Sequence, residues 1–198
     1  MIGECKASSR NLLPDSVFSQ LVHLGLKHLD SETYEQTVKL VVSVGHPNAH
    51  AHQTAIGNHM NLIKPATLER LVKLKALYPG SLDLWELKRC LVAQPFSYES
   101  DEKLNQLIDG KLSQIRIRSH VVACFKKLLN TGNGYYGIET VHGAYVMSQP
   151  PSDLKVEELH EVAVELASPL TGYLSRERGA DWRSDRFSWL RDLSVEAI

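Results

Sequence analysis

The stretch that decides the expected fold is IRIRSHVVACFKKLLNTGNGYYGIETVHGAYVM, residues 115–147. Up to residue 129 its apolar residues recur at the helical period, with basic residues between them. Residues 130–134, NTGNG, are turn formers. After them, β-branched and aromatic residues alternate around His142-Gly143, which predicts a two-stranded hairpin over residues 134–147. A basic helix followed by a hairpin is therefore the central expectation.

Outside this stretch the sequence pattern is mostly helical. Apolar residues recur at helical spacing in residues 15–29, 31–44, 66–77, 82–93 and 100–115. A short helix near residues 48–59, a tight turn and Pro65 at a helix-starting position predict a helix-turn-helix. Residues 78–81, YPGS, predict a domain boundary, and Pro150-Pro151 predicts a second one.

These patterns predict a mainly α protein in three parts. Residues 1–78 are expected to form a helical helix-turn-helix domain, because two packed helices precede the turn and the helix after Pro65. Residues 79–150 are expected to form a winged helix, since three helices followed by a β-hairpin have that order. Residues 151–198 are expected to form an acidic helical tail.

The net charge of −1 conceals an uneven distribution of charge along the chain. Residues 1–150 contain 16 Lys and Arg against 13 Asp and Glu, whereas residues 151–198 contain 6 against 10. Between Lys103 and Leu128 there are six basic residues and one acid, Asp109. Positive charge is concentrated where a phosphate backbone could be contacted, although a solvated helix face gives the same count.

Residues 115–147 resemble the C-terminal part of the OmpR-type winged-helix domain of response regulators. The residues that match the family's recognition helix and wing are Ile117, His120, Val121, Lys126, Lys127 and Leu128, then Ile138, Thr140, Val141, Gly143 and Tyr145. The resemblance implies a helix in the major groove with a hairpin beside it. The DNA-binding residues expected on this basis are Arg116, Arg118, Ser119, His120, Lys126, Lys127, Thr140 and His142.

Residues 12–78 resemble the small helical regulators of fimbrial adhesin synthesis. The matching segments are LLPDSVFSQLVHL, VVSVGHPNAHAHQTAIGNHMNL and TLERLVKLKALY. The resemblance implies a second recognition helix with an exposed side formed by Lys64, Thr67, Arg70 and Lys73. The alternative is an amphipathic core helix whose lysines are solvated.

The expected function is sequence-specific binding of double-stranded DNA in a cytoplasmic transcription regulator. No catalytic residues, metal or cofactor are expected, and no apolar run approaches the roughly 20 residues that a membrane helix needs. Besides DNA, RNA polymerase, another regulator or a second copy of the chain are candidate partners. The C-terminal residues that suggest such a contact, or else cap the protein's own core, are Trp182, Phe187, Trp189 and Leu190.

Other interpretations are open at this point. Ala123 and Phe125 replace residues that are basic in the OmpR-type family, which favours a winged-helix adaptor, or a subunit of a nucleic-acid complex, without base readout. His46 and His50 have a spacing that could hold a metal, but neither a zincin glutamate nor a cysteine accompanies them. An enzyme, for example a nuclease, would need a catalytic constellation that cannot be assembled here. The three widely spaced cysteines, Cys5, Cys90 and Cys124, are expected to be reduced thiols.

Overall fold

The computed structural model describes residues 2–5, 12–78, 80–92, 99–129 and 134–195. Pro79, residues 130–133 of the predicted turn and the side chain of Cys5 lie outside the description. The chain is mainly helical, as the sequence predicts. It divides into two compact units, Met1–Lys111 and Leu112–Ala197, with the division inside the helix α6 (Glu99–Leu129).

A three-stranded parallel sheet forms the centre of the first unit. Its strands are β1 (Ile2–Cys5), β3 (Lys39–Val42) and β5 (Met60–Ile63), and β3 lies between the other two. The helices α1 (Asp15–His28) and α2 (Ser31–Gln36) connect β1 to β3, and α3 (Ala49–Gly57) connects β3 to β5. A short parallel pair, β2 (Leu12–Leu13) with β4 (His46–Pro47), accompanies the sheet.

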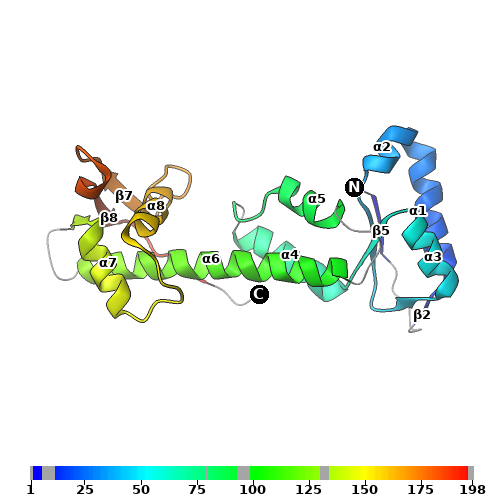
Figure 1. Ribbon diagram of the computed structural model, residues 1–198, viewed down its shortest axis with the longest axis horizontal. Helices are drawn as coiled ribbons and strands as arrows, with labels where there is room; N and C mark the ends of the chain where they lie inside the picture. The colour runs from blue at the N-terminus through cyan, green and yellow to red at the C-terminus, as the bar shows by residue number, and fades with distance from the viewer. Residues whose placement is uncertain (1, 6–11, 79, 93–98, 130–133, 196–198) are drawn as a thin grey trace. The chain divides into compact units, whose positions relative to one another are not determined.

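Helices cover both faces of this sheet, as Figure 1 shows. The helices α1 and α3 pack on the face that carries Val41 and Leu62. The opposite face carries Val42 and Ile63 and contacts α4 (Pro65–Leu77), α5 (Leu84–Val92) and the first turns of α6. Alternate residues of a strand point to opposite faces, and so all four residues of β3 and of β5 are buried.

The sheet overturns the predicted helix-turn-helix of residues 1–78. The predicted helix over residues 31–44 is wrong, because α2 ends at Gln36 and the β-branched Val41 and Val42 belong to a strand. A turn at Asn58-His59 does follow α3, but it leads into the strand β5, so that a buried strand separates α3 from α4. The helices predicted at residues 15–29 and 66–77 are confirmed, and Pro65 is the first residue of α4.

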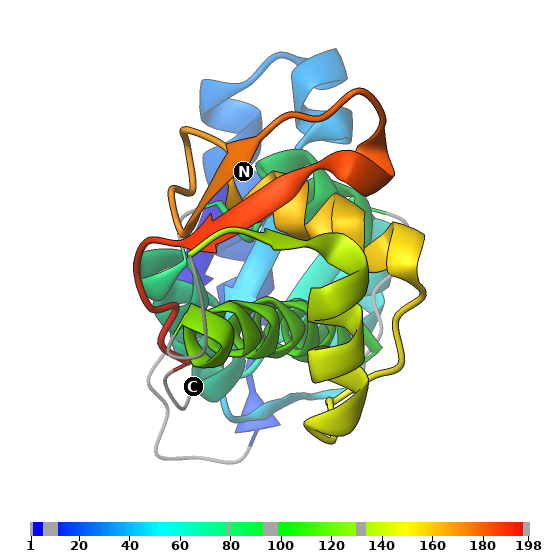
Figure 2. The same cartoon turned by 90° about the vertical axis from the view of Figure 1, so that its left-hand side faces the viewer.

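The second unit combines three helices with a small antiparallel sheet. The later turns of α6 are followed by β6 (Tyr136–Gly137), α7 (Ile138–Met147) and α8 (Val156–Leu166). The strands β7 (Leu174–Glu177) and β8 (Arg186–Trp189) come last, with the 3-10 turn η1 (Trp182–Ser184) between them. In the sheet β8 pairs with β6 on one side and with β7 on the other. Figure 2 shows β7 and β8 side by side, in orange and red.

The core of the second unit lies among α6, α7, α8 and the sheet. Its fully buried side chains include Phe125, Val141, Leu159 and Phe187. The rings of Phe125 and Phe187 lie 6.0 Å apart and join α6 to β8. Burial of one such side chain contributes about 2–3 kcal/mol, so these contacts give the unit a core of its own.

The predicted hairpin over residues 134–147 is wrong, because residues 138–147 form the helix α7. Ile138, Val141 and Tyr145 are spaced by three and four residues and are all fully buried, which is the spacing of one helix face. The Tyr145 hydroxyl donates a hydrogen bond to the Ser152 carbonyl at 2.6 Å.

The remaining secondary-structure predictions are confirmed in part. The helices predicted on either side of residue 116 are one helix, α6, which continues through Gly110. The amphipathic stretch of the expected helical tail does form α8, but the chain then continues into β7 and β8. The tail is therefore part of a folded unit.

Candidate nucleic-acid interface

The four residues expected on a recognition helix in the first unit are engaged in contacts within that unit. Thr67 is 3 % exposed, and its hydroxyl accepts a hydrogen bond from Asn105 Nδ2 at 2.9 Å. Arg70 donates to Asn105 Oδ1 at 2.5 Å and to Asp109 Oδ1 at 2.6 Å. Lys64 and Lys73 pair with Asp101 at 3.8 Å and with Glu69 at 2.8 Å. The helix α4 packs on a sheet, and Lys64, Arg70 and Lys73 each have an acidic partner.

Four of the residues expected on the basic helix of the second unit also have partners within their unit. Arg118 donates through Nε and Nη2 to both carboxylate oxygens of Glu165, at 2.9 and 2.6 Å. The other three contacts join Ser119 Oγ to the Leu193 carbonyl, His120 Nε2 to Ser148 Oγ, and Lys126 Nζ to Asp192. Burial, followed by the charge of Lys127, lowers the pKa of His120. This part of α6 packs in the core of the second unit and is not an exposed recognition helix.

The other expected residues are scattered over the second unit. Arg116 and Lys127 are exposed on α6, and neither forms an ion pair with any described residue. Thr140 is exposed on α7, while His142 Nε2 lies 2.8 Å from the Leu154 carbonyl oxygen. The structure therefore does not bring the predicted DNA contacts together on one surface.

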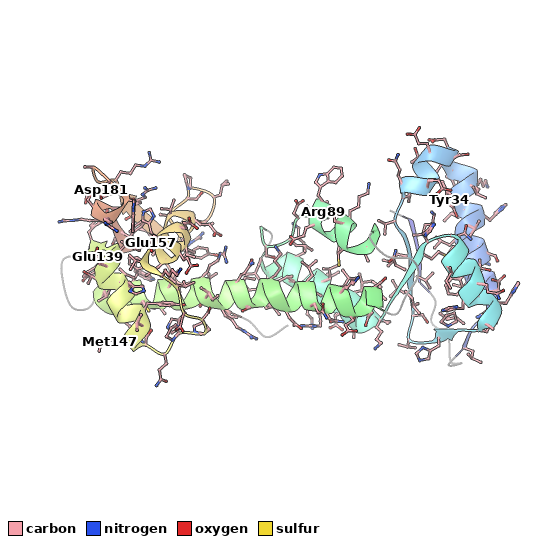
Figure 3. The ribbon with its side chains drawn as sticks, viewed as in Figure 1. Tyr34, Arg89, Glu139, Met147, Glu157 and Asp181 are labelled. Atoms are coloured by element: carbon pink, nitrogen blue, oxygen red, sulfur yellow. The ribbon has the colours of Figure 1, made fainter. Side chains whose placement is uncertain are left out.

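The exposed side of α8 is acidic. Its exposed carboxylates are Glu157, Glu158, Glu161 and Glu165. Figure 3 shows Glu157 on this helix. Two acids in the first turn suit the positive end of the helix dipole, and the Glu158 side chain accepts from the backbone N–H of Lys155 at 2.8 Å. The carboxylates therefore stabilise the helix and make it a poor surface for a polyanion.

Exposed arginines gather instead on the connection between β7 and β8 and at the first residue of β8. We define the arginine turn as residues 178–186, in which Arg178, Arg183 and Arg186 are exposed. None of the three forms an ion pair with a residue of the described part of the chain. The guanidinium of Arg183 lies 5.0 Å from the Trp182 ring, a cation–π contact that restricts its position. Figure 3 labels Asp181 in the same turn.

The buried carboxylate of Asp185 holds the arginine turn in shape. Asp185 is 2 % exposed and accepts from Arg176 Nε at 2.9 Å, Arg176 Nη2 at 2.5 Å and the Gly179 N–H at 3.0 Å. His160 Nε2, on α8, lies 2.8 Å from the same carboxylate. Burial raises the pKa of Asp185, but the hydrogen bonds from His160, Gly179 and Arg176 outweigh it and lower the pKa to about 2. One carboxylate therefore ties together α8, β7 and the turn.

Gly179 is required by the close approach of the two arms of the turn. A Cβ atom at this position would lie 2.5 Å from the backbone carbonyl carbon of Ser184, a distance that real Cβ atoms do not show. On the far arm, Asp181 accepts from the Ser184 N–H at 2.9 Å, and the Ser184 hydroxyl lies 3.0 Å from the Asp181 nitrogen. The turn is thus narrow and internally hydrogen-bonded.

The residues of this turn were not among the DNA contacts expected from the sequence. The sequence feature that could have indicated them is the segment RERGADWRSDR, residues 176–186, which has four arginines in eleven positions. The excess of acids over residues 151–198 concealed it. Trp182 and Trp189 pack against the core of their own unit, which was one of the two roles expected for the C-terminal aromatic residues. Leu190 is 53 % exposed.

Two other expectations concern metal and cysteine chemistry. Among the described residues no group of three or more His, Cys, Asp or Glu side chains is arranged to hold a metal ion. His50 lies 4.0 Å from Asp15, in a contact at the helix start. Cys90 and Cys124 are free thiols, and burial raises the pKa of Cys90.

A cavity of about 510 Å³ lies in the first unit at the carboxyl ends of β3 and β5. Its polar lining is largely occupied by internal hydrogen bonds, since Ser43 Oγ accepts from the Gly45 N–H at 3.1 Å and Asp101 from the Lys64 N–H at 2.8 Å.

Comparisons with known proteins add no relative. No family model matches the chain, and neither a curated protein nor a solved structure does. Over the part of the chain that the structure describes, none of the helices has the length and apolar character needed to cross a membrane.

Proposed function

We propose that the second unit is a winged helix that binds double-stranded DNA through the arginine turn, in a chain that regulates transcription. The order of elements supports the winged helix. A helix, a strand, two helices and a two-stranded hairpin follow one another, and the first strand pairs with the last. In this assignment α7 and α8 are the helix-turn-helix pair, and the arginine turn is the wing. The sequence predicts the wing earlier in the chain, at residues 134–147.

The observation that carries DNA binding is the set of exposed arginines without ion pairs in the described part of the chain. Arg178, Arg183 and Arg186 come from one turn that Asp185 holds rigid. Arginines on a rigid support bind phosphate oxygens at a smaller entropic cost than arginines on a mobile loop. Three phosphate contacts would give a modest, salt-dependent affinity.

A second candidate function is a protein-interaction adaptor. The observation that favours it is the acidic side of α8, where a DNA-reading winged helix needs neutral or basic side chains. On this alternative α8 binds a basic partner protein, and the unit serves as a scaffold.

The two functions differ in the salt dependence of duplex binding. The test is the fluorescence anisotropy of a labelled 20-base-pair duplex titrated with the whole chain at several salt concentrations. Because each neutralised phosphate contributes about −0.9 to the slope of log K against log salt, three arginines should give a slope between about −2 and −3. The affinity should then fall roughly 20- to 60-fold between about 50 and 200 mM salt. Absence of duplex binding at the lower salt would contradict the proposal and leave the adaptor.

A further inference from the structure

We infer that the cavity at the carboxyl ends of β3 and β5 binds a small organic amine, a cation with an apolar body and an oxygen that accepts a hydrogen bond. The cavity belongs to the first unit, so this inference goes beyond the proposed function and does not depend on it. It rests on the position of the cavity, on the charges around it and on a buried hydroxyl in its wall.

The cavity lies where the connections from two neighbouring strands diverge. The chain leaves β3 toward α3, on the face that carries Val41 and Leu62, but it leaves β5 toward α4, on the opposite face. A crevice therefore remains between the two connections, and in open α/β sheets this is where ligands bind. Residues 43–46 after β3 and Lys64 after β5 line it. Its volume of about 510 Å³ is in the range of sites for small organic molecules.

The start of α6 forms a further wall of the cavity and is fixed to the sheet. Ser100 is fully buried, and its Oγ donates a hydrogen bond to Asn61 Oδ1 on β5 at 2.8 Å. Asp101 accepts from the Lys64 N–H at 2.8 Å, which joins the helix to the connection after β5. Figure 1 shows the start of α6 close to β5. A wall held in this way avoids the entropic cost of ordering it when a ligand binds.

The charges around the cavity favour a cation. Asp101 and Lys64 lie 3.8 Å apart, so their charges largely offset each other. Glu102 also lines the cavity, is exposed, and forms no ion pair or hydrogen bond with any described residue. An ammonium group in the cavity would be attracted by this carboxylate, whereas an anion would be repelled by it.

The wall also provides a hydrogen-bond donor and apolar side chains. Ser43 is 2 % exposed, and its Oγ accepts from the Gly45 N–H at 3.1 Å but donates to no described residue. A buried hydroxyl that lacks an acceptor favours a ligand whose oxygen accepts its hydrogen bond. Val44, Leu62 and Ile63 supply the apolar part of the lining. An amine with an apolar body and an acceptor oxygen matches these features together.

The test uses phenylalaninol, which has an ammonium group, a hydroxyl oxygen and an apolar ring. Isothermal titration calorimetry with the whole chain should give a Kd in the low millimolar range or tighter, as expected for a ligand of this size. Hydrocinnamyl alcohol lacks the ammonium group and hydrocinnamate is an anion, so each should bind at least about tenfold more weakly. Equal binding of the three compounds, or no binding of phenylalaninol, would overturn the inference.

Two variants locate the site on the chain. Glu102→Gln should weaken the binding of phenylalaninol about tenfold or more, because a charge-assisted hydrogen bond becomes a neutral one. The control, Glu69→Gln, removes the same charge from α4 outside the lining of the cavity and should change the affinity less than about twofold. Both glutamates are exposed, so both variants should fold. Equal losses in the two variants would overturn the inference and leave duplex binding by the second unit, and with it the proposed function, untouched.

Discussion

Replacing Asp185 with alanine should destabilise the second unit by about 3–5 kcal/mol, because a buried ionic network loses its one acceptor. Arg176, His160 and the Gly179 N–H would all lose their partner in a site where Asp185 is 2 % exposed. The measurement is urea unfolding followed by tryptophan fluorescence. In a Trp85→Phe background the remaining tryptophans, Trp182 and Trp189, both belong to the second unit.

The matched control is Asp181→Ala in the same turn. Asp181 is exposed and accepts from the Ser184 N–H, so its loss should destabilise the unit less than the loss of the buried Asp185. An Asp185 variant that loses no more stability than the Asp181 variant would show that the buried carboxylate does not hold the turn.

Acid should reduce the contribution of Asp185 to the stability of the second unit. Its pKa is lowered in the folded unit, from 3.8 to about 2, so that its stabilising effect is present above the unfolded pKa and is lost as the pH falls toward 2. The difference in unfolding free energy between the natural chain and Asp185→Ala should therefore be constant above about pH 5 and shrink between about pH 4 and pH 2. A difference that does not shrink between about pH 4 and pH 2 would contradict the lowered pKa.

Reversing the charge of two turn arginines, Arg178→Glu with Arg183→Glu, should weaken duplex binding on the order of 100-fold. The reason is that like charges brought together across an interface cost several kcal/mol. The salt slope should become less steep by about 2, since two phosphate contacts are lost. Both side chains are exposed and form no ion pair with described residues, so that the fold should be kept.

The control for this pair is Arg116→Glu with Lys127→Glu on α6. It makes the same change of charge on two exposed side chains of the same unit. We expect a loss of affinity below about fivefold, from the weaker long-range field alone. Arg118 is unsuitable as a control because it pairs with Glu165, and a glutamate there would disturb the packing of α8. Equal losses in the two variants would remove the arginine turn from the interface.

The sequence predicts local helices well where the apolar period is long and clear. α1, α4 and α5 form close to the expected residues, and Pro65 begins α4 as expected. The helical period fails at β3 and β5, because strands buried on both faces show no alternation of apolar and polar residues, and even their polar residues Lys39 and Asn61 are buried. The parallel sheet depends on pairing between distant segments, which one sequence does not show.

The site was harder to predict than the helices. Ile138, Val141 and Tyr145 have helical spacing, but the β-branched and aromatic residues around them favoured a hairpin, and the packing of α7 against the core shows the helix. The basic residues of α6 suggested a DNA surface, yet Arg118 and Lys126 have acidic partners that lie 47 and 66 residues away in the sequence. The excess of arginines in the turn can be seen in the sequence. The shape of the turn depends on Asp185, and no local sequence pattern predicts that this residue is buried.

Amide hydrogen exchange of the whole chain, with and without a DNA duplex, tests the central claim most directly. We expect the duplex to slow exchange in residues 178–186 and to leave α8 unchanged, because the turn makes the contact and the acidic helix stays in solvent. Protection of α8 with no change in the turn would contradict the account.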